Sequence, residues 1–143
     1  MKINRVENSK IGSIDFENLT FGKIFTDHMF ISKYKNGEWS PGEIKPYENI
    51  SISPSARALH YGQAIFEGMK CFKSEEDELF LFRPEENFKR FNKSSVRLAI
   101  PEIQENIFFN GLKELLKIDS DWIKKGIGNA LYVRPFVFAS EDS

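Results

Sequence analysis

The sequence predicts an α+β domain in which an antiparallel sheet packs against helices. Two observations lead to this fold class. Short strand-like runs are mixed with segments that have the apolar spacing of amphipathic helices, without the strict alternation of βαβ units. Apolar residues make up 41% and charged residues 29% of the 143 residues, an ordinary globular balance that allows one sizeable core.

The N-terminal part is expected to contain a hairpin between irregular segments. Residues 1–20 are polar and mixed in charge, and we expect them to form an irregular arm. Residues 29–40 alternate in polarity around Asn36-Gly37, a dipeptide that favours a two-residue hairpin turn. Residues 41–59 are rich in Pro, Ser and Gly, which indicates a loop, with a short strand expected near residues 50–52.

The middle of the chain predicts two strands followed by a helix. Residues 65–73 and 78–83 have strand composition and are joined by an acidic turn. Pro84 then suits the first turn of a helix that ends before Pro101. The apolar stripe of this helix is expected to consist of Phe88, Phe91 and Leu98, with Ser95 between them.

The C-terminal part predicts a second helix, a loop and a strand. Residues 102–118 have an amphipathic pattern, with Phe108, Leu112, Leu115 and Leu116 on one side. Gly126 and Gly128 mark a loop. Residues 130–139 are expected to form the last strand, buried on both faces because apolar residues occupy both of its faces.

Charge, cysteine content and motifs exclude several classes of function. The net charge of −1 offers no basic field for nucleic acid. The single cysteine, Cys71, rules out an internal disulfide and fits a reducing compartment. The sequence has neither a signal-peptide core nor an 18-residue apolar run. A cytoplasmic protein without a membrane partner is therefore predicted. Metal-ligand spacings and glycine-rich nucleotide loops are absent, so no metal site is predicted.

Arg134 is the most unusual residue of the last predicted strand. Tyr132, Arg134, Phe136 and Phe138 fall on one face of that strand, and a buried guanidinium is costly unless an anion meets it. The pattern leaves two partners open. The anion is either a core carboxylate, with Glu67 the best candidate, or a bound ligand.

Two further groups of residues could carry chemistry. Helical spacing places Arg90, Lys93 and Arg97 on one face, which is either a solvated basic face or the border of a phosphate site. Residues 59–70 combine His60, Tyr61, Glu67 and two glycines, Gly62 and Gly68. These glycines indicate either close packing or the close approach of a ligand, and a lone histidine is more often structural than catalytic.

Four segments in register resemble a known family. They are FGKIFTDHMF, SPSARALHYGQAIFEGMKCFK, LFRPEENFKRFNKSSVRLAIP and LYVRPFVFAS, and they cover roughly residues 20–140. Together they resemble the N-terminal part of branched-chain amino acid aminotransferases, which are pyridoxal-phosphate enzymes of fold type IV. The resemblance implies that residues 21–143 form the N-terminal small domain of such an enzyme, preceded by the arm.

The resemblance also implies a role for each matching residue. Arg90 corresponds to the arginine that binds the cofactor phosphate. Arg134 corresponds to the residue that, with Tyr61, receives the distal carboxylate of glutamate or 2-oxoglutarate. The walls of the aliphatic pocket correspond to Phe21, Tyr61, Phe66 and Tyr132. The implied reaction moves an amino group from leucine, isoleucine or valine to 2-oxoglutarate in a homodimer, with pyridoxal 5'-phosphate as cofactor.

One feature of the family has no counterpart in this sequence. The family's Schiff-base lysine lies in a second, larger domain, and Lys70 and Lys73 do not align with it. No catalytic residue is therefore expected in this chain, which should be an N-terminal fragment that is inactive alone and does not bind the cofactor. Two alternatives stay open: a non-catalytic phosphate- or carboxylate-binding domain, and a dimerisation domain of the same fold.

Overall fold

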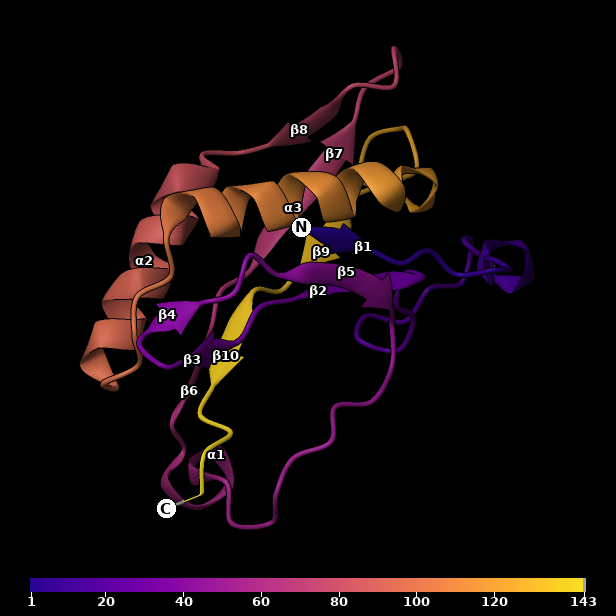
Figure 1. Cartoon of the computed structure of the whole chain (residues 1–143). Helices are drawn as coiled ribbons and strands as arrows, with labels where there is room; N and C mark the ends of the chain where they lie inside the picture. The colour runs from indigo at the N-terminus through magenta and orange to yellow at the C-terminus, as the bar shows by residue number, and fades with distance from the viewer. Residues whose placement is uncertain (143) are drawn as a thin grey trace. The chain divides into compact units, whose positions relative to one another are not determined.

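The computed structural model describes residues 1–142, which form two compact units (Figure 1). The first unit consists of residues 1–49 and 106–122, and the second of residues 50–105 together with the described residues from 123 onward. Both units combine short strands with helix, so the α+β class is confirmed.

The first unit is built on a three-stranded sheet of order β1-β5-β2. Strand β5 (Glu43–Pro46) lies between β2 (His28–Ile31), which is antiparallel to it, and β1 (Lys2–Ile3), which is parallel to it. The arm is otherwise irregular, apart from the short η1 (Ile11–Ser13). Its first strand joins the sheet edge by main-chain pairing, for which composition gives no signal.

The predicted hairpin is confirmed. Strands β3 (Tyr34–Lys35) and β4 (Glu38–Trp39) pair around Asn36-Gly37, and both turn residues have positive φ, 55° and 88°. These are the angles that a two-residue primed turn requires. The strand expected near residues 50–52 is wrong, because these residues are irregular and the strand lies earlier, at β5.

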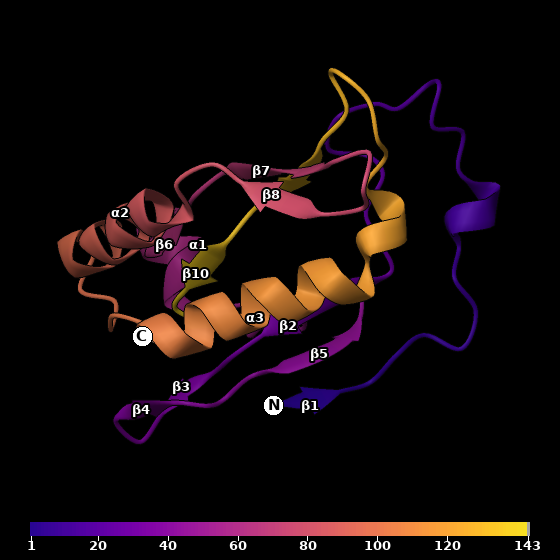
Figure 2. The same ribbon diagram turned by 90° about the horizontal axis from the view of Figure 1, so that it is seen from above.

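Helix α3 (Glu105–Ile118) covers the sheet of the first unit, as Figure 2 shows, and η2 (Ser120–Trp122) follows it. Gly111 brings the helix close to the sheet, because the Phe30 ring lies where a side chain at position 111 would begin. Of the predicted core residues, Phe108, Leu112 and Leu116 are buried and Leu115 is only half-buried. Ile107, which was not predicted, is buried as well.

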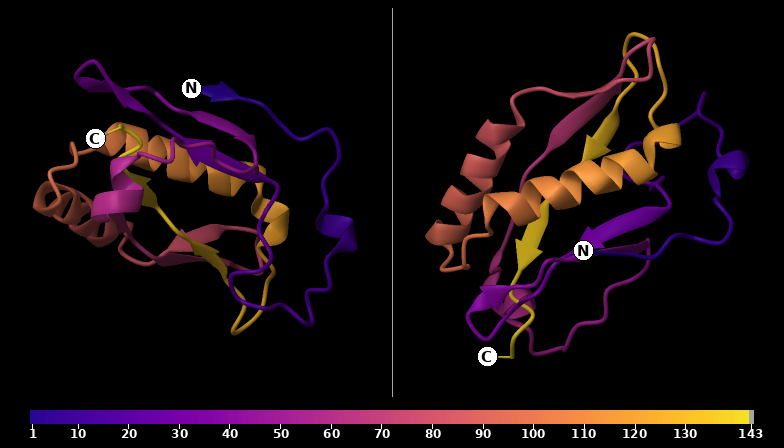
Figure 3. Two further views of the ribbon diagram at one scale, coloured as in Figure 1. Left: turned by 90° about the horizontal axis from the view of Figure 1, so that it is seen from below. Right: turned by 45° about the horizontal axis from the view of Figure 1, so that its top comes forward.

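The second unit contains two antiparallel sheets whose strands continue one another. The order β8-β7-β9 joins Leu79–Leu81, Met69–Lys73 and Leu131–Val133, and the pair β10-β6 joins Phe136–Phe138 to Ala64–Phe66. Both long strands predicted here are therefore interrupted, one at Glu67-Gly68 and the other at Arg134-Pro135 (Figure 3). Proline lacks the N–H group that a continuous ladder needs.

Helices α1 (Arg57–Tyr61) and α2 (Pro84–Arg97) complete the second unit. Helix α2 begins at Pro84 and ends before Pro101, as predicted, and Figure 1 shows it near β6. Its buried stripe is Asn87, Phe91 and Ser95, while Phe88 is half-buried and Leu98 is exposed. Among the described residues, no helix combines the length and the hydropathy of a membrane span, and no group of three potential metal ligands occurs.

Candidate functional site

The two strand breaks of the second unit face each other and form the candidate site. The N–H of Glu67 donates to the carbonyl oxygen of Pro135 at 2.8 Å, which joins the β6–β7 break to the β9–β10 break. On one side Phe66 pairs with Phe136, and on the other Met69 pairs with Val133. Residues between and beside the paired strands are thus brought together from positions far apart in the sequence.

Arg134 is exposed, so the expectation that its strand is buried on both faces is wrong. Its Nη2 donates to the Tyr132 hydroxyl at 3.1 Å, and its guanidinium carbon lies 4.6 Å from the Phe66 ring centroid and 5.2 Å from that of Tyr132. Within residues 1–142 it has no carboxylate at ion-pair distance. Stacking on aromatic rings stabilises the cation without neutralising it.

Glu67, the core carboxylate considered for Arg134, is paired with Arg90 instead. Nε and Nη2 of Arg90 donate to the two carboxylate oxygens of Glu67, each at 2.9 Å. Asn87 adds a third hydrogen bond to Glu67 at 3.0 Å. The hydrogen bonds from Arg90 are the main reason that the pKa of Glu67 lies below its usual value, although burial opposes the shift.

Tyr132 is seated over Gly68. A Cβ atom on residue 68 would overlap the Tyr132 hydroxyl, and Cζ of the ring would lie 2.9 Å from it. Gly68 is therefore a packing glycine. Of the two roles considered for it, close packing and the close approach of a ligand, the structure supports close packing. Gly62 has a different function: it ends α1 with a φ of 63°, the left-handed conformation common at helix ends.

Two other predicted pocket residues, Tyr61 and Phe21, are largely exposed. Tyr61 is 72% exposed and lines an open pocket of about 480 Å³ with Arg57, Gln63 and Leu98. Phe21 is 73% exposed and belongs to the first unit. The structure therefore brings together Phe66, Tyr132 and Arg134, and it places Arg90 against Glu67, the residue that follows Phe66.

The other candidate residues, His60, Lys93 and Arg97, have structural or solvent-exposed positions. Nε2 of His60, an exposed residue of α1, forms a hydrogen bond with the carbonyl oxygen of Pro54 at 2.7 Å. Lys93 and Arg97 are exposed on α2, and neither forms an ion pair among the described residues, so they are solvated. Only Arg90 of the predicted basic face is directed to a partner.

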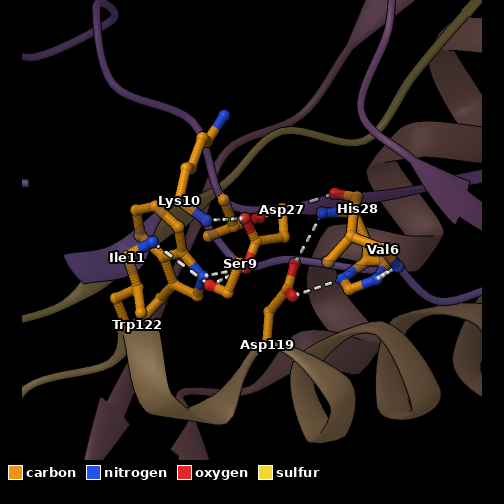
Figure 4. A network of polar contacts seen from close by, with 9 residues as sticks. Val6, Ser9, Lys10, Ile11, Asp27, His28, Asp119 and Trp122 are labelled. Carbon is orange, nitrogen blue, oxygen red and sulfur yellow. Dashed lines mark hydrogen bonds and ion pairs between the residues drawn. The ribbon is translucent and has the colours of Figure 1, made fainter. Parts of the chain in front are cut away.

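A buried polar network in the first unit was not predicted from the sequence (Figure 4). Nδ1 of His28 lies 2.7 Å from Asp119, and Nε2 of His28 accepts from the N–H of Val6 at 3.0 Å. Because Nε2 accepts, the ring is neutral and its proton is on Nδ1. Both ring nitrogens are occupied, so His28 holds the arm and does not serve as a base.

Asp27 forms the other half of this network. It accepts hydrogen bonds from the Ser9 hydroxyl, the Lys10 N–H and the Trp122 indole. Burial alone would raise the pKa of Asp27, but these three hydrogen bonds outweigh burial and hold the pKa below its usual value. The signal in the sequence was the pair Asp27-His28, but its partner Asp119 is 91 residues away from His28.

No family model matches the chain. The chain is 48% identical over 128 residues to "Branched-chain-amino-acid aminotransferase 2" of Bacillus subtilis, covering 89% of this chain and 35% of that protein. It is 51% identical over 124 residues to a "Probable branched-chain-amino-acid aminotransferase" of Staphylococcus aureus, covering 86% and 34%. The chain thus spans about a third of the length of the curated relatives it matches.

Two similar solved structures are also branched-chain amino acid aminotransferases. A branched-chain amino acid aminotransferase from "T.th.", complexed with N-(5'-phosphopyridoxyl)-L-glutamate, matches with a TM-score of 0.54 and 26% identity, over 74% of this chain and 32% of that one. The Thermoproteus uzoniensis enzyme with norvaline matches with a TM-score of 0.57 and 18% identity, over 80% and 35%, which shows the fold alone. The resemblance found in the four segments, and with it fold type IV, is confirmed.

Proposed function

We propose that this chain forms the substrate-binding part of a branched-chain-amino-acid aminotransferase. The starting point is the homology of the chain to about a third of such enzymes. The reaction transfers an amino group between leucine, isoleucine or valine and 2-oxoglutarate. The names of the relatives support the branched-chain substrates. The phosphopyridoxyl-glutamate complex of a similar structure supports both the second substrate and the cofactor.

The observation that carries the proposal is the environment of Arg134. Its guanidinium lies against Phe66 and Tyr132, and within residues 1–142 no carboxylate neutralises it. Such a surface can contact an aliphatic side chain through the rings. It can also bind a carboxylate through the guanidinium, as glutamate and 2-oxoglutarate require.

The residues present also fit the phosphate of pyridoxal 5'-phosphate. Arg90 uses two of its five N–H groups on Glu67, so three are left for an anion. When bound, the cofactor serves as the electron sink for chemistry at the amino-bearing carbon. Arg90 would hold its phosphate. We propose that the lysine that attaches the cofactor belongs to polypeptide outside the third represented here, as the family resemblance implies.

The exposed Tyr61 and Phe21 suit a pocket that needs further polypeptide to be complete. Each exposes more than two thirds of its surface, which is unfavourable for an aromatic wall unless something covers it. We propose that they become walls of the aliphatic pocket in the assembled enzyme, a homodimer, with Tyr61 also assisting at the distal carboxylate. A cytoplasmic location stays a prediction from the single cysteine and the absence of a signal core.

The test is substrate discrimination by the complete enzyme that contains this chain. Arg134→Ala should lower kcat/KM for glutamate by roughly 10- to 100-fold, the value of one lost charge-assisted hydrogen-bonded contact. Leucine, which offers only an aliphatic side chain there, should lose much less. Arg97→Ala removes an equal charge from exposed α2 and should change neither. Equal losses for glutamate and leucine would contradict the role of Arg134.

The alternatives are tested with the 143-residue chain itself. Pyridoxal phosphate is added, the mixture is reduced with borohydride, and labelled lysines are mapped by mass spectrometry. We expect scattered, substoichiometric labelling. Stoichiometric labelling of one lysine would instead indicate a binding domain that functions without further polypeptide.

A further inference from the structure

Glu67 and Arg90 form an ion pair whose two sides have very different surroundings. The side chain of Glu67 is 9% exposed and that of Arg90 is 63% exposed. The carboxylate is thus fixed inside the second unit, while most of the guanidinium faces outward. This asymmetry distinguishes the pair from an ordinary surface salt bridge, in which both side chains move freely.

The geometry of the pair fixes the direction of the guanidinium. Nε and Nη2 of Arg90 donate to different oxygens of Glu67, so one edge of the planar group is held at two points. A planar group held at two points along one edge cannot rotate about either bond alone. One remaining N–H of Nη2 and one N–H of Nη1 form the terminal edge, which is the free edge of the guanidinium, and the second N–H of Nη1 lies on the side of Cδ. No described residue accepts a hydrogen bond from these three groups.

The carboxylate is itself held from two sides. Nδ2 of Asn87, one helical turn before Arg90 on α2, donates to Glu67 at 3.0 Å and to the carbonyl oxygen of Gly68 at 3.1 Å. The main-chain N–H of Glu67 donates a hydrogen bond to the carbonyl oxygen of Pro135. Glu67 thus connects α2 to the two strand breaks, one directly after Phe66 and the other at Arg134.

We infer that Glu67 is a positioning residue: it holds Arg90 so that the free edge of the guanidinium receives a phosphate dianion. The inference rests on the proposed role of Arg90 and adds the residue that prepares it. The ion pair with Glu67 occupies only the inner edge of the guanidinium. An arginine that is ordered in advance binds an anion without losing side-chain freedom at that moment.

The experiment uses the 143-residue chain with 15N-labelled arginine and inorganic phosphate as the probe. In the unchanged chain, the Arg90 Nε–H resonance, assigned by its loss in Arg90→Lys, should be ordered on the nanosecond timescale and should shift on phosphate addition. In Glu67→Gln, this order should be lost and phosphate affinity should fall about fivefold, as expected if the competent orientation is occupied about a fifth of the time. Glu85→Gln, an exposed change of equal charge in the first turn of α2, should preserve both.

A second variant covers the case in which Glu67→Gln does not fold, as judged by far-UV circular dichroism. Glu67→Asp keeps the buried charge but shortens the side chain, so a purely neutralising role predicts unchanged phosphate affinity, whereas positioning predicts a loss. Unchanged order and affinity in the folded variants would overturn the inference. An ordered Arg90 without phosphate binding in the unchanged chain would overturn the phosphate role itself, and the two failures are therefore distinguishable.

Discussion

The Tyr132 side chain fills the space beside Gly68, so no other residue fits at position 68 unless the ring moves. The Tyr132 hydroxyl lies where a Cβ atom of residue 68 would be, and the same hydroxyl accepts a hydrogen bond from Arg134. The glycine thus supports the side chain that orients the guanidinium. Its φ is not in the left-handed region, so the requirement is one of space and not of backbone conformation.

Gly68→Ala should therefore displace Tyr132 and release Arg134. We expect a loss of about 1 kcal/mol in the free energy of unfolding, at the low end for overpacking because Tyr132 is only half-buried. The measurement is urea unfolding of the single variants and the double variant with Tyr132→Ala. If the overlap is the cause, Gly68→Ala should cost almost nothing in the Tyr132→Ala background; additive losses would show that the two residues are independent.

Gly111→Ala should lower the stability of the chain, although alanine in place of a helical glycine usually raises it. An alanine in place of a helical glycine ordinarily stabilises by about 1 kcal/mol. At position 111 the new Cβ would lie 2.6 Å from the Phe30 ring, so we expect Gly111→Ala to destabilise the chain by about 1–3 kcal/mol. Thermal unfolding with Phe30→Leu as a second background checks this, since a smaller ring-free side chain should reduce the penalty. A stabilised Gly111→Ala would contradict the close approach of α3 to β2.

The elements that the sequence predicted correctly are those determined by neighbouring residues. The hairpin depends on Asn36 and Gly37, whose positive φ is a local preference. Helix α2 depends on Pro84 and on spacing within one segment. These signals do not require knowledge of which segments meet.

The site depends on pairs that are distant in sequence, which is why the pattern gave the wrong partner. Glu67 was a reasonable partner for Arg134, but both of its oxygens are occupied by Arg90, 23 residues away. The resemblance to the aminotransferases named Arg90 and Arg134 but did not name Glu67. Similarly, nothing near His28 indicated Asp119, because their contact depends on the packing of α3 against the sheet.

Cys71 should react with thiol reagents only when the second unit unfolds. The side chain has no exposed surface, and burial raises the pKa of its thiol, so both access and thiolate content are low. Labelling with 5,5'-dithiobis(2-nitrobenzoic acid) across a urea series should follow the unfolding curve measured by circular dichroism. Rapid stoichiometric labelling in native buffer would show that β7 opens independently of global unfolding.

Because of Asp27, the free energy of unfolding of the first unit should depend on pH in the acidic range. Its pKa in the folded chain is held below the value of about 3.9 expected when unfolded, so the unfolded state binds the proton more readily. The carboxylate therefore contributes stability that is fully present above about pH 5 and is lost as the pH falls through the folded pKa. Urea unfolding followed by tryptophan fluorescence measures this slope, over a range from about pH 3 to about pH 7 that brackets the unfolded pKa.

Asp27→Asn should flatten that slope and lower the free energy of unfolding at neutral pH by about 1–3 kcal/mol. The amide has one oxygen for the three donors that Asp27 now accepts, from Ser9, Lys10 and Trp122, so at least one donor loses its partner inside the unit. Asp121→Asn, an exposed carboxylate of the same unit, serves as the control and should keep the acid slope of the unchanged chain. If Asp27→Asn kept the same slope as well, the acid response would arise elsewhere, and the network in Figure 4 would not be its source.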